Sequence, residues 1–156
     1  MDTESRLDIL NLIAAYTHLA DSGDVEALAE LFAEDGVFIG YGADPTQSLR
    51  LSGRSELPAF IEQGRKKGRE GGFMSIHFQG PTQFLEVTAT TARTRTRALL
   101  GHTDLRSPAP LEAGTYTDTF VKVDGQWRIA ERIMRRDKST IASWFSEDGR
   151  PLPESS

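Results

Sequence analysis

The sequence predicts an α+β fold in which helices come first and a run of β-hairpins follows. Up to about residue 72, apolar side chains recur at the spacing of amphipathic helices, whereas after residue 73 they alternate as in strands. The dipeptide Asp124-Gly125 between two alternating runs is a strong hairpin signal. The βαβ alternation of a parallel sheet is absent. We therefore expect a curved antiparallel sheet whose concave face carries three helices from the N-terminal half and encloses a pocket.

Three helices are expected, over residues 3–20, 25–33 and from 55 to between 64 and 72. Gly23 marks the stop of the first helix, and Asp24 is placed to cap the second. Ser55 is placed to cap the third, with Pro58 tolerated in its first turn.

Strands are expected over residues 37–41, 73–78, 84–87, 91–104, 114–123 and 126–135. The polar segment 42–54 contains proline and glycine, so we expect a loop over the mouth of the pocket. Residues 1–140 form a single domain by this interpretation, and residues 141–156 form a C-terminal tail. Within the tail, Trp144-Phe145 could dock on the body of the protein or on a neighbouring subunit.

The alternation of side chains predicts which face of the strand 91–104 points inward, but it does not do so for the last strand, 126–135. Arg93, Arg95 and Arg97 share one face of the segment 91–104, which favours a solvated or subunit-contact face. The small and apolar set on the other face, ending in His102, should then point inward. In the last strand Trp127, Ile129, Glu131 and Ile133 alternate with Arg128, Ala130, Arg132 and Met134, and without the register either set could line a cavity.

Composition excludes several classes of protein. With 156 residues, 38% apolar and 26% charged, the chain is typical of one soluble domain. It has no apolar run long enough for a membrane span, its acidic start is unlike a secretory signal, and its net charge of −5 argues against nucleic-acid binding. The lack of cysteine excludes disulfides, thiolate nucleophiles and Cys-based zinc sites. These features predict a cytoplasmic protein.

One pair of residues is a candidate for acid–base chemistry. Asp21 closes the first predicted helix, and His77 lies in an apolar, strand-like segment. A carboxylate that holds an imidazole in one tautomer makes a general base near neutral pH, and this chemistry needs no metal and no cofactor. His18, three residues before Asp21 on the same helix, is an alternative partner for the carboxylate.

Several motifs together resemble a known superfamily. They are Tyr16-Thr17-His18-Leu19-Ala20-Asp21-Ser22-Gly23-Asp24, Ala27-Leu28-Ala29-Glu30-Leu31-Phe32 before Val37-Phe38, His77-Phe78-Gln79-Gly80, Gly114-Thr115-Tyr116-Thr117-Asp118, and Val123-Asp124-Gly125-Gln126-Trp127-Arg128-Ile129. Over roughly residues 3–138 the chain resembles the NTF2-like α+β cone, within its SnoaL-like and scytalone-dehydratase-like branch.

The resemblance implies roles for particular residues. Scytalone dehydratase is similar in having an Asp after helix 1, a His that opens a His-Phe-x-Gly run and a second His, which match Asp21, His77 and His102. Bacterial bile-acid dehydratases are similar in having a Tyr five residues before the Asp, as Tyr16 stands before Asp21.

The chain also departs from scytalone dehydratase. Ala20 stands where that enzyme has a Tyr, and Gly114 and Tyr116 stand near its Ser and Asn. The position of that enzyme's pocket tyrosine, on the first strand, matches a site near Gly40 in this chain, and Tyr41 is one residue away from it. The polar set that recognises scytalone is not retained, so scytalone itself is not the expected substrate.

The resemblance implies a cofactor-free dehydratase that eliminates water from a hydrophobic cyclic hydroxy-carbonyl compound. His77 would be the base that Asp21 orients, Tyr16 or His102 would supply a proton, and Tyr41 and Tyr116 would bind the substrate. The alternatives are an enzyme like ketosteroid isomerase or a polyketide cyclase, or a non-catalytic ligand-binding or structural subunit such as the small subunit of ring-hydroxylating oxygenases. The expected partners are a small hydrophobic molecule and further copies of the chain. We expect a homodimer or homotrimer through the outer sheet face, because Arg, Tyr and Trp are enriched at interfaces.

Overall fold

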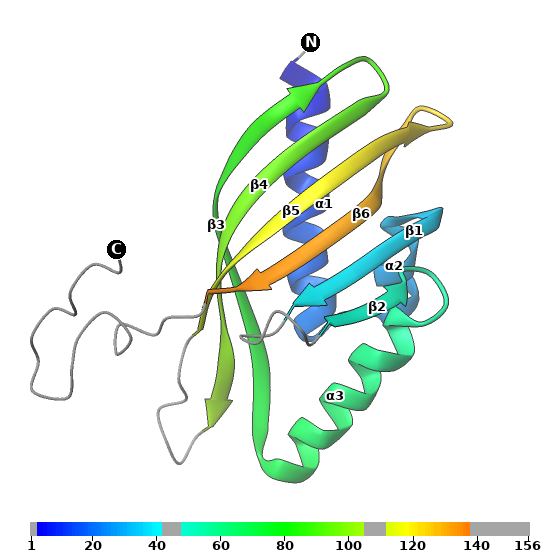
Figure 1. Ribbon diagram of the computed structural model, residues 1–156. Helices are drawn as coiled ribbons and strands as arrows, with labels where there is room; N and C mark the ends of the chain where they lie inside the picture. Colours follow the sequence, from blue (N-terminus) through cyan, green and yellow to red (C-terminus); the bar gives the residue numbers. More distant parts are fainter. Residues whose placement is uncertain (1–2, 42–47, 105–111, 138–156) are drawn as a thin grey trace, which may run out of the picture.

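The computed structural model describes residues 3–41, 48–104 and 112–137, which build an α+β fold around one six-stranded sheet (Figure 1). The elements are α1 (Thr3–Asp21), α2 (Val25–Glu30), β1 (Phe32–Tyr41), β2 (Ser48–Ser52), α3 (Leu57–Gly71), β3 (Phe73–Val87), β4 (Thr91–Asp104), β5 (Glu112–Val123) and β6 (Gln126–Arg136). The predicted fold class is confirmed. The expectations for the tail 141–156, and for part of the loop 42–54 as a cover over the pocket, lie outside the described residues.

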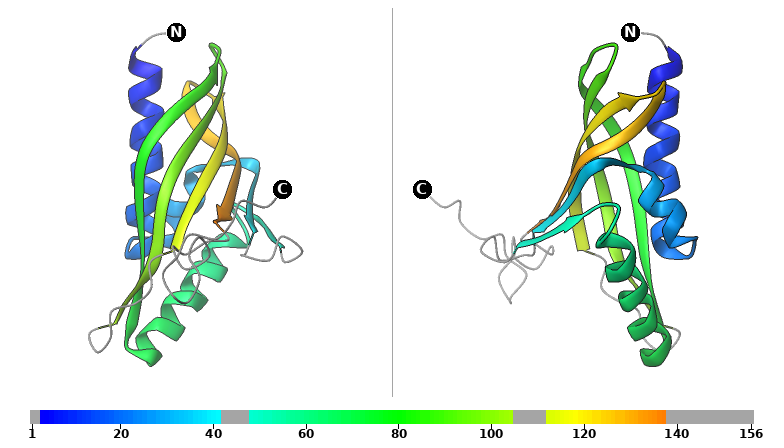
Figure 2. Two further views of the ribbon diagram at one scale, coloured as in Figure 1. Left: turned by 60° about the vertical axis from the view of Figure 1, so that its left-hand side comes forward. Right: turned by 90° about the vertical axis from the view of Figure 1, so that its right-hand side faces the viewer.

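The sheet is curved, and the helices lie on its concave side (Figure 2). Its strand order is β2-β1-β6-β5-β4-β3, and every neighbouring pair is antiparallel except β1 and β6, which run parallel. The expectation of a wholly antiparallel sheet is corrected at this one pair. After the edge strand β2, the chain crosses through α3 to β3 at the opposite edge of the sheet. Antiparallel strands β3 to β6 then follow in order back across the sheet, and β6 lies beside β1 and runs parallel to it. None of the described helices is both long and apolar enough to cross a lipid bilayer.

Two boundaries in the first half differ from the sequence prediction. Helix α2 ends at Glu30, and Phe32 already begins β1, where it pairs with Ile129 of β6. Part of the expected loop is the edge strand β2, which pairs with β1 through Leu51 and Phe38. A polar sequence is tolerated there because an edge strand is exposed to solvent on one side.

The expected strands at 73–78 and 84–87 are one continuous strand, β3. Gly80-Pro81 does not break it, because a register shift between Gln79 and Thr82 accommodates the proline, which has no N–H to donate. The expected cap of the third helix is also corrected. Glu56 occupies the N-cap position of α3 without a side-chain cap bond, and its carboxylate instead accepts from the backbone N–H of Ser52.

The predicted hairpin is confirmed, and a bulge in its second strand decides which residues face inward. Asp124 and Gly125 both have positive φ, 50° and 80°, as the tight turn requires. Phe120 pairs with Ile129, but Thr119 pairs with Glu131, so β6 holds one extra residue, Ala130. The extra residue exchanges the two faces of β6. As a result, the buried residues of β6 are Trp127, Ile129, Arg132 and Met134.

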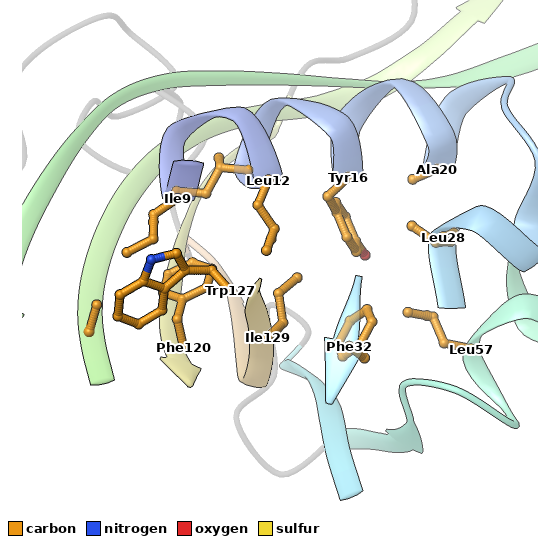
Figure 3. Packing of buried hydrophobic residues seen from close by; sticks show 12 residues of the cluster. Ile9, Leu12, Tyr16, Ala20, Leu28, Phe32, Leu57, Phe120, Trp127 and Ile129 are labelled. Atoms are coloured by element: carbon orange, nitrogen blue, oxygen red, sulfur yellow. The ribbon is translucent and has the colours of Figure 1, made fainter. Parts of the chain in front are cut away.

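The core fills the space between α1 and the concave face of the sheet (Figure 3). Its buried members are Ile9, Leu12, Ile13, Tyr16, Ala20, Leu28, Phe32, Leu57, Ala92, Phe120, Trp127 and Ile129. The parity of β4 is confirmed, because Arg93, Arg95 and Arg97 are exposed whereas the intervening Thr94 and Thr96 are fully buried.

Candidate active site

Asp21 and His77 meet, although 56 positions separate them in the chain. Oδ1 of Asp21 lies 2.5 Å from Nδ1 of His77, and Oδ2 accepts the backbone N–H of His77 at 3.0 Å. Both side chains are mostly buried, with exposed fractions of 19% and 21%. Because a carboxylate only accepts hydrogen bonds, Nδ1 of His77 carries the proton, and in the neutral ring Nε2 is the basic nitrogen.

The position of Asp21 follows from how α1 ends. Asp21 is the last residue of α1, and Arg65 of α3 donates to the backbone carbonyls of Leu19, Ala20 and Gly23 around it. This guanidinium satisfies carbonyl groups that a helix end leaves without intrahelical partners. A carboxylate at a helix C-terminus is disfavoured by the helix dipole, whereas a cation there is stabilised. Arg65 therefore holds the end of α1, and with it the backbone of Asp21, against α3.

A cavity of about 720 Å³ opens beside this pair. Its walls are formed by Tyr16, Phe38, Gly40, Tyr41, Ser48, Leu49, Leu57, Phe60, Ile61, Ser75, Ile76, His77, Leu100, Gly101, His102, Glu112, Tyr116, Met134 and Arg136. Five of the six predicted site residues are in this wall, and Asp21 is not. Asp21 therefore supports His77 from behind, and His77 is the member of the pair that faces the cavity.

The other two histidines differ in position. His102 lies opposite Ser75 in the β3–β4 register, so it shares a face of the sheet with His77 at the next diagonal position. It is exposed at the edge of the cavity, and its ring meets the ring of Phe73 edge-on. His18 is exposed on α1, and the partner of Asp21 is His77. The alternative pairing of Asp21 with His18 is therefore wrong.

The two tyrosines deepest in the cavity are held in the protonated form. Burial raises the pKa of Tyr16 to about 12, although the nearby Arg132 opposes the shift. Burial also raises the pKa of Tyr116, and Tyr16 adds to that effect. Both hydroxyl groups are therefore hydrogen-bond donors at neutral pH. Their rings pack edge-on, with centroids 6.2 Å apart.

Sequence reasoning missed a buried charged cluster behind the cavity. Arg132 and Asp118 are fully buried, and Nε of Arg132 lies 3.2 Å from Oδ1 of Asp118. Nη2 of Arg132 donates to Oε1 of Gln79 at 2.7 Å. Parity placed Asp118 with Tyr116 and Phe120, but the bulge at Ala130 that turns Arg132 inward has no local sequence signal.

No group of three or more His, Asp or Glu side chains within residues 3–41, 48–104 and 112–137 is arranged to hold a metal ion. The chemistry that these residues offer is proton transfer by a carboxylate-supported imidazole, with neutral phenols beside it.

Comparison with known proteins supports the resemblance. A family model described as a SnoaL-like domain matches residues 1–133. An NTF2-like protein with a cystatin-like fold from Novosphingobium aromaticivorans is 31% identical, with a TM-score of 0.71, over 90% of this chain and 87% of that one. A provisionally named scytalone dehydratase from the same organism is 25% identical, with a TM-score of 0.69, over 97% of this chain and 95% of its own.

A further structure shows how widely this fold is used. The β subunit of a provisionally named aromatic-ring-hydroxylating dioxygenase from N. aromaticivorans has a TM-score of 0.66 at 17% identity, over 95% of this chain and 97% of its own. At that identity the likeness concerns the fold alone. The family model, which spans most of the sequence, and the NTF2-like cone of the structure agree: the chain belongs to the family of SnoaL-like domains.

Proposed function

We propose that the protein is a dehydratase that eliminates water from a hydrophobic cyclic β-hydroxy carbonyl compound. One observation carries the proposal: Asp21 holds Nδ1 of His77, and His77 forms part of the wall of a cavity that both apolar and polar side chains line. A volume of about 720 Å³ is within the range of sites for drug-sized ligands, roughly 300–1,000 Å³.

The reaction would begin at Nε2 of His77. This nitrogen takes the proton from the carbon beside the carbonyl group, and the resulting imidazolium is stabilised by Asp21. The electron pair of the broken C–H bond moves toward the carbonyl oxygen, where a neutral phenol such as Tyr16 or Tyr116 donates a hydrogen bond.

The second step would release water. The electron pair returns to form the carbon–carbon double bond while the bond to the β-hydroxyl group breaks. His102 or the protonated His77 supplies the proton that converts the leaving hydroxide into water. The product is a conjugated enone, and the enzyme ends in its starting protonation state after exchange with solvent.

An isomerase or cyclase that uses a single carboxylate as its base is the main competing enzyme. The geometry favours the histidine, because Asp21 lies behind His77 and is not among the residues that line the cavity. A non-catalytic carrier or structural subunit would need an apolar cavity but no oriented base.

A screen of hydroxylated cyclic ketones, followed by the ultraviolet absorbance of the new enone, tests the proposal. General acid–base catalysis contributes about 10²–10⁴-fold, so His77→Ala and Asp21→Asn should each reduce turnover within that range. His18→Ala is the matched control, because His18 is an exposed histidine on α1. Full activity in His77→Ala, with loss in Asp21→Asn, would favour the single-carboxylate mechanism instead.

We also propose that the protein forms a homodimer or homotrimer through the outer face of the sheet. Phe78 and Leu99 lie opposite each other there and are 69% and 41% exposed. Light scattering should give a mass of two or three chains, and Phe78→Lys should lower it; a monomeric wild type would contradict this proposal.

A further inference from the structure

Arg132 is a fully buried cation that the proposed reaction does not use. It is not among the residues that line the cavity, because the rings of Tyr16 and Tyr116 stand against it. Its guanidinium carbon lies 3.9 Å from the ring centre of Tyr16 and 4.2 Å from that of Tyr116. A buried ion pair is often no more stabilising than well-packed apolar residues, so stability alone does not account for Arg132 and Asp118.

Arg132 fixes the orientation of one amide. A guanidinium has only donors, so the group of Gln79 that faces Arg132 must be its carbonyl oxygen, Oε1. Nε2 of Gln79 is then turned toward α1, where it donates to the backbone carbonyl of Ile13 at 3.2 Å and to the hydroxyl group of Thr17.

This contact and the candidate catalytic contact join the same two elements. Thr17 and Asp21 are four residues apart, so they share one face of α1. Gln79 and His77 are two residues apart, so they share one face of β3. The Thr17–Gln79 and Asp21–His77 contacts are therefore successive links between α1 and β3, and Arg132 holds the first of them from β6.

We propose that Arg132 is a positioning residue which, through Gln79, holds α1 and β3 at the separation that the Asp21–His77 hydrogen bond needs. The inference rests on the proposed role of His77 as the base, but it concerns how the pair is built and not which substrate it serves. Arg132 touches neither the cavity nor the reacting atoms; its effect reaches His77 through one amide and one helix turn.

Imidazole nitrogen–proton NMR tests the proposal without a substrate. The protein has three histidines, so few signals compete, and His77→Gln identifies the Nδ1 proton of His77 by its loss. In the wild type this proton should resonate at low field and exchange slowly with water. In Arg132→Met and Gln79→Met the Nδ1 proton of His77 should exchange with water up to about tenfold faster. A factor of that size corresponds to the net free energy of about one hydrogen bond.

Two variants separate positioning from general loss of structure. Arg128→Met makes the same substitution on the same strand, away from Gln79, and should leave the signal unchanged. Thr17→Val keeps the shape of the side chain but removes the hydroxyl acceptor of the Gln79 amide, and should also accelerate exchange. If Arg132→Met does not fold, Gln79→Met and Thr17→Val decide the question.

Unchanged exchange of the His77 proton in folded Gln79→Met and Thr17→Val would overturn the proposal. This outcome is distinct from failure of the proposed function, which the enone assay measures. Once that assay has identified a substrate, steady-state kinetics provide a second test of the proposal. Gln79→Met should lower kcat and leave KM nearly unchanged, because Gln79 does not line the cavity.

Discussion

The buried carboxyl group of Asp118 should make the stability of this protein depend on pH in an unusual direction. Burial raises the pKa of Asp118 from 3.8 to about 6, although Arg132 opposes the shift. Between these two values the folded protein holds a proton on Asp118 while the unfolded chain has lost it. The contribution of Asp118 is therefore fully present below about pH 4 and is lost as the pH rises through 6.

The size of the effect follows from the shift. About two pKa units at 1.36 kcal/mol each correspond to about 3 kcal/mol of unfolding free energy lost between pH 4 and pH 7. Other carboxylates add slopes of their own, so the measurement is a difference between two proteins. Urea unfolding of the wild type and of Asp118→Asn, at intervals from pH 4 to pH 7.5, isolates the contribution of this group because asparagine does not titrate.

Two further proteins make the result specific. Asp124→Asn changes an exposed carboxyl group in the turn of the β5–β6 hairpin and should reproduce the wild-type curve. In Arg132→Met the slope due to Asp118 should start at the same pH but extend to higher pH, because the cation that lowers the pKa of the folded carboxyl group is gone. A wild-type curve that runs parallel to that of Asp118→Asn across this range would refute the reasoning.

Three other substitutions test the packing by urea unfolding. Phe120→Ala should cost about 3–5 kcal/mol, because Phe120 is fully buried in the core. Gly53→Ala should cost about 1–3 kcal/mol, since an added Cβ would lie 2.2 Å from the fully buried ring of Phe32. Arg97→Ala should change stability by less than about 1 kcal/mol despite its 2.7 Å ion pair with Asp137, because Arg97 is 55% exposed. A marginal loss in Gly53→Ala, or a loss above 2 kcal/mol in Arg97→Ala, would contradict the corresponding argument.

Local patterns were sufficient to predict most of the fold. The Asp124-Gly125 turn, the bounds of β4 and its parity depend on residues close in sequence, so the pattern could be read directly. The parallel pairing of β1 with β6 and the edge strand β2 depend on partners far along the chain. Gly80-Pro81 looked like a strand break because its bulge needs the neighbouring strand β4 for support.

In the candidate site, too, some features could be predicted from the sequence, whereas others depend on residues far apart in the chain. The chemistry of a carboxylate and an imidazole made Asp21 and His77 a candidate pair, the family resemblance supported it, and the structure brings their atoms together across 56 positions of sequence. Arg132 escaped prediction because its inward orientation requires the bulge at Ala130. If the side chains of β6 alternated strictly from Trp127 onward, Arg132 would lie on the outer face of the sheet, on the side away from the core residue Ile129.

The concave face of the sheet has a packed end and an open end, so the residues that stabilise the fold and the candidate catalytic residues lie in different places. One end packs Phe120, Trp127 and Ile129 against the start of α1, while the other end is open around His77. The charged cluster of Arg132 lies between these ends. Substitution in the packed end should therefore lower stability without altering the His77 proton signal, whereas Asp21→Asn should alter that signal, because asparagine leaves one acceptor oxygen for the two N–H groups of His77. Arg132 contacts the ring of Tyr16, which belongs to the core and also lines the cavity, so Arg132→Met should change both the stability and the His77 proton signal.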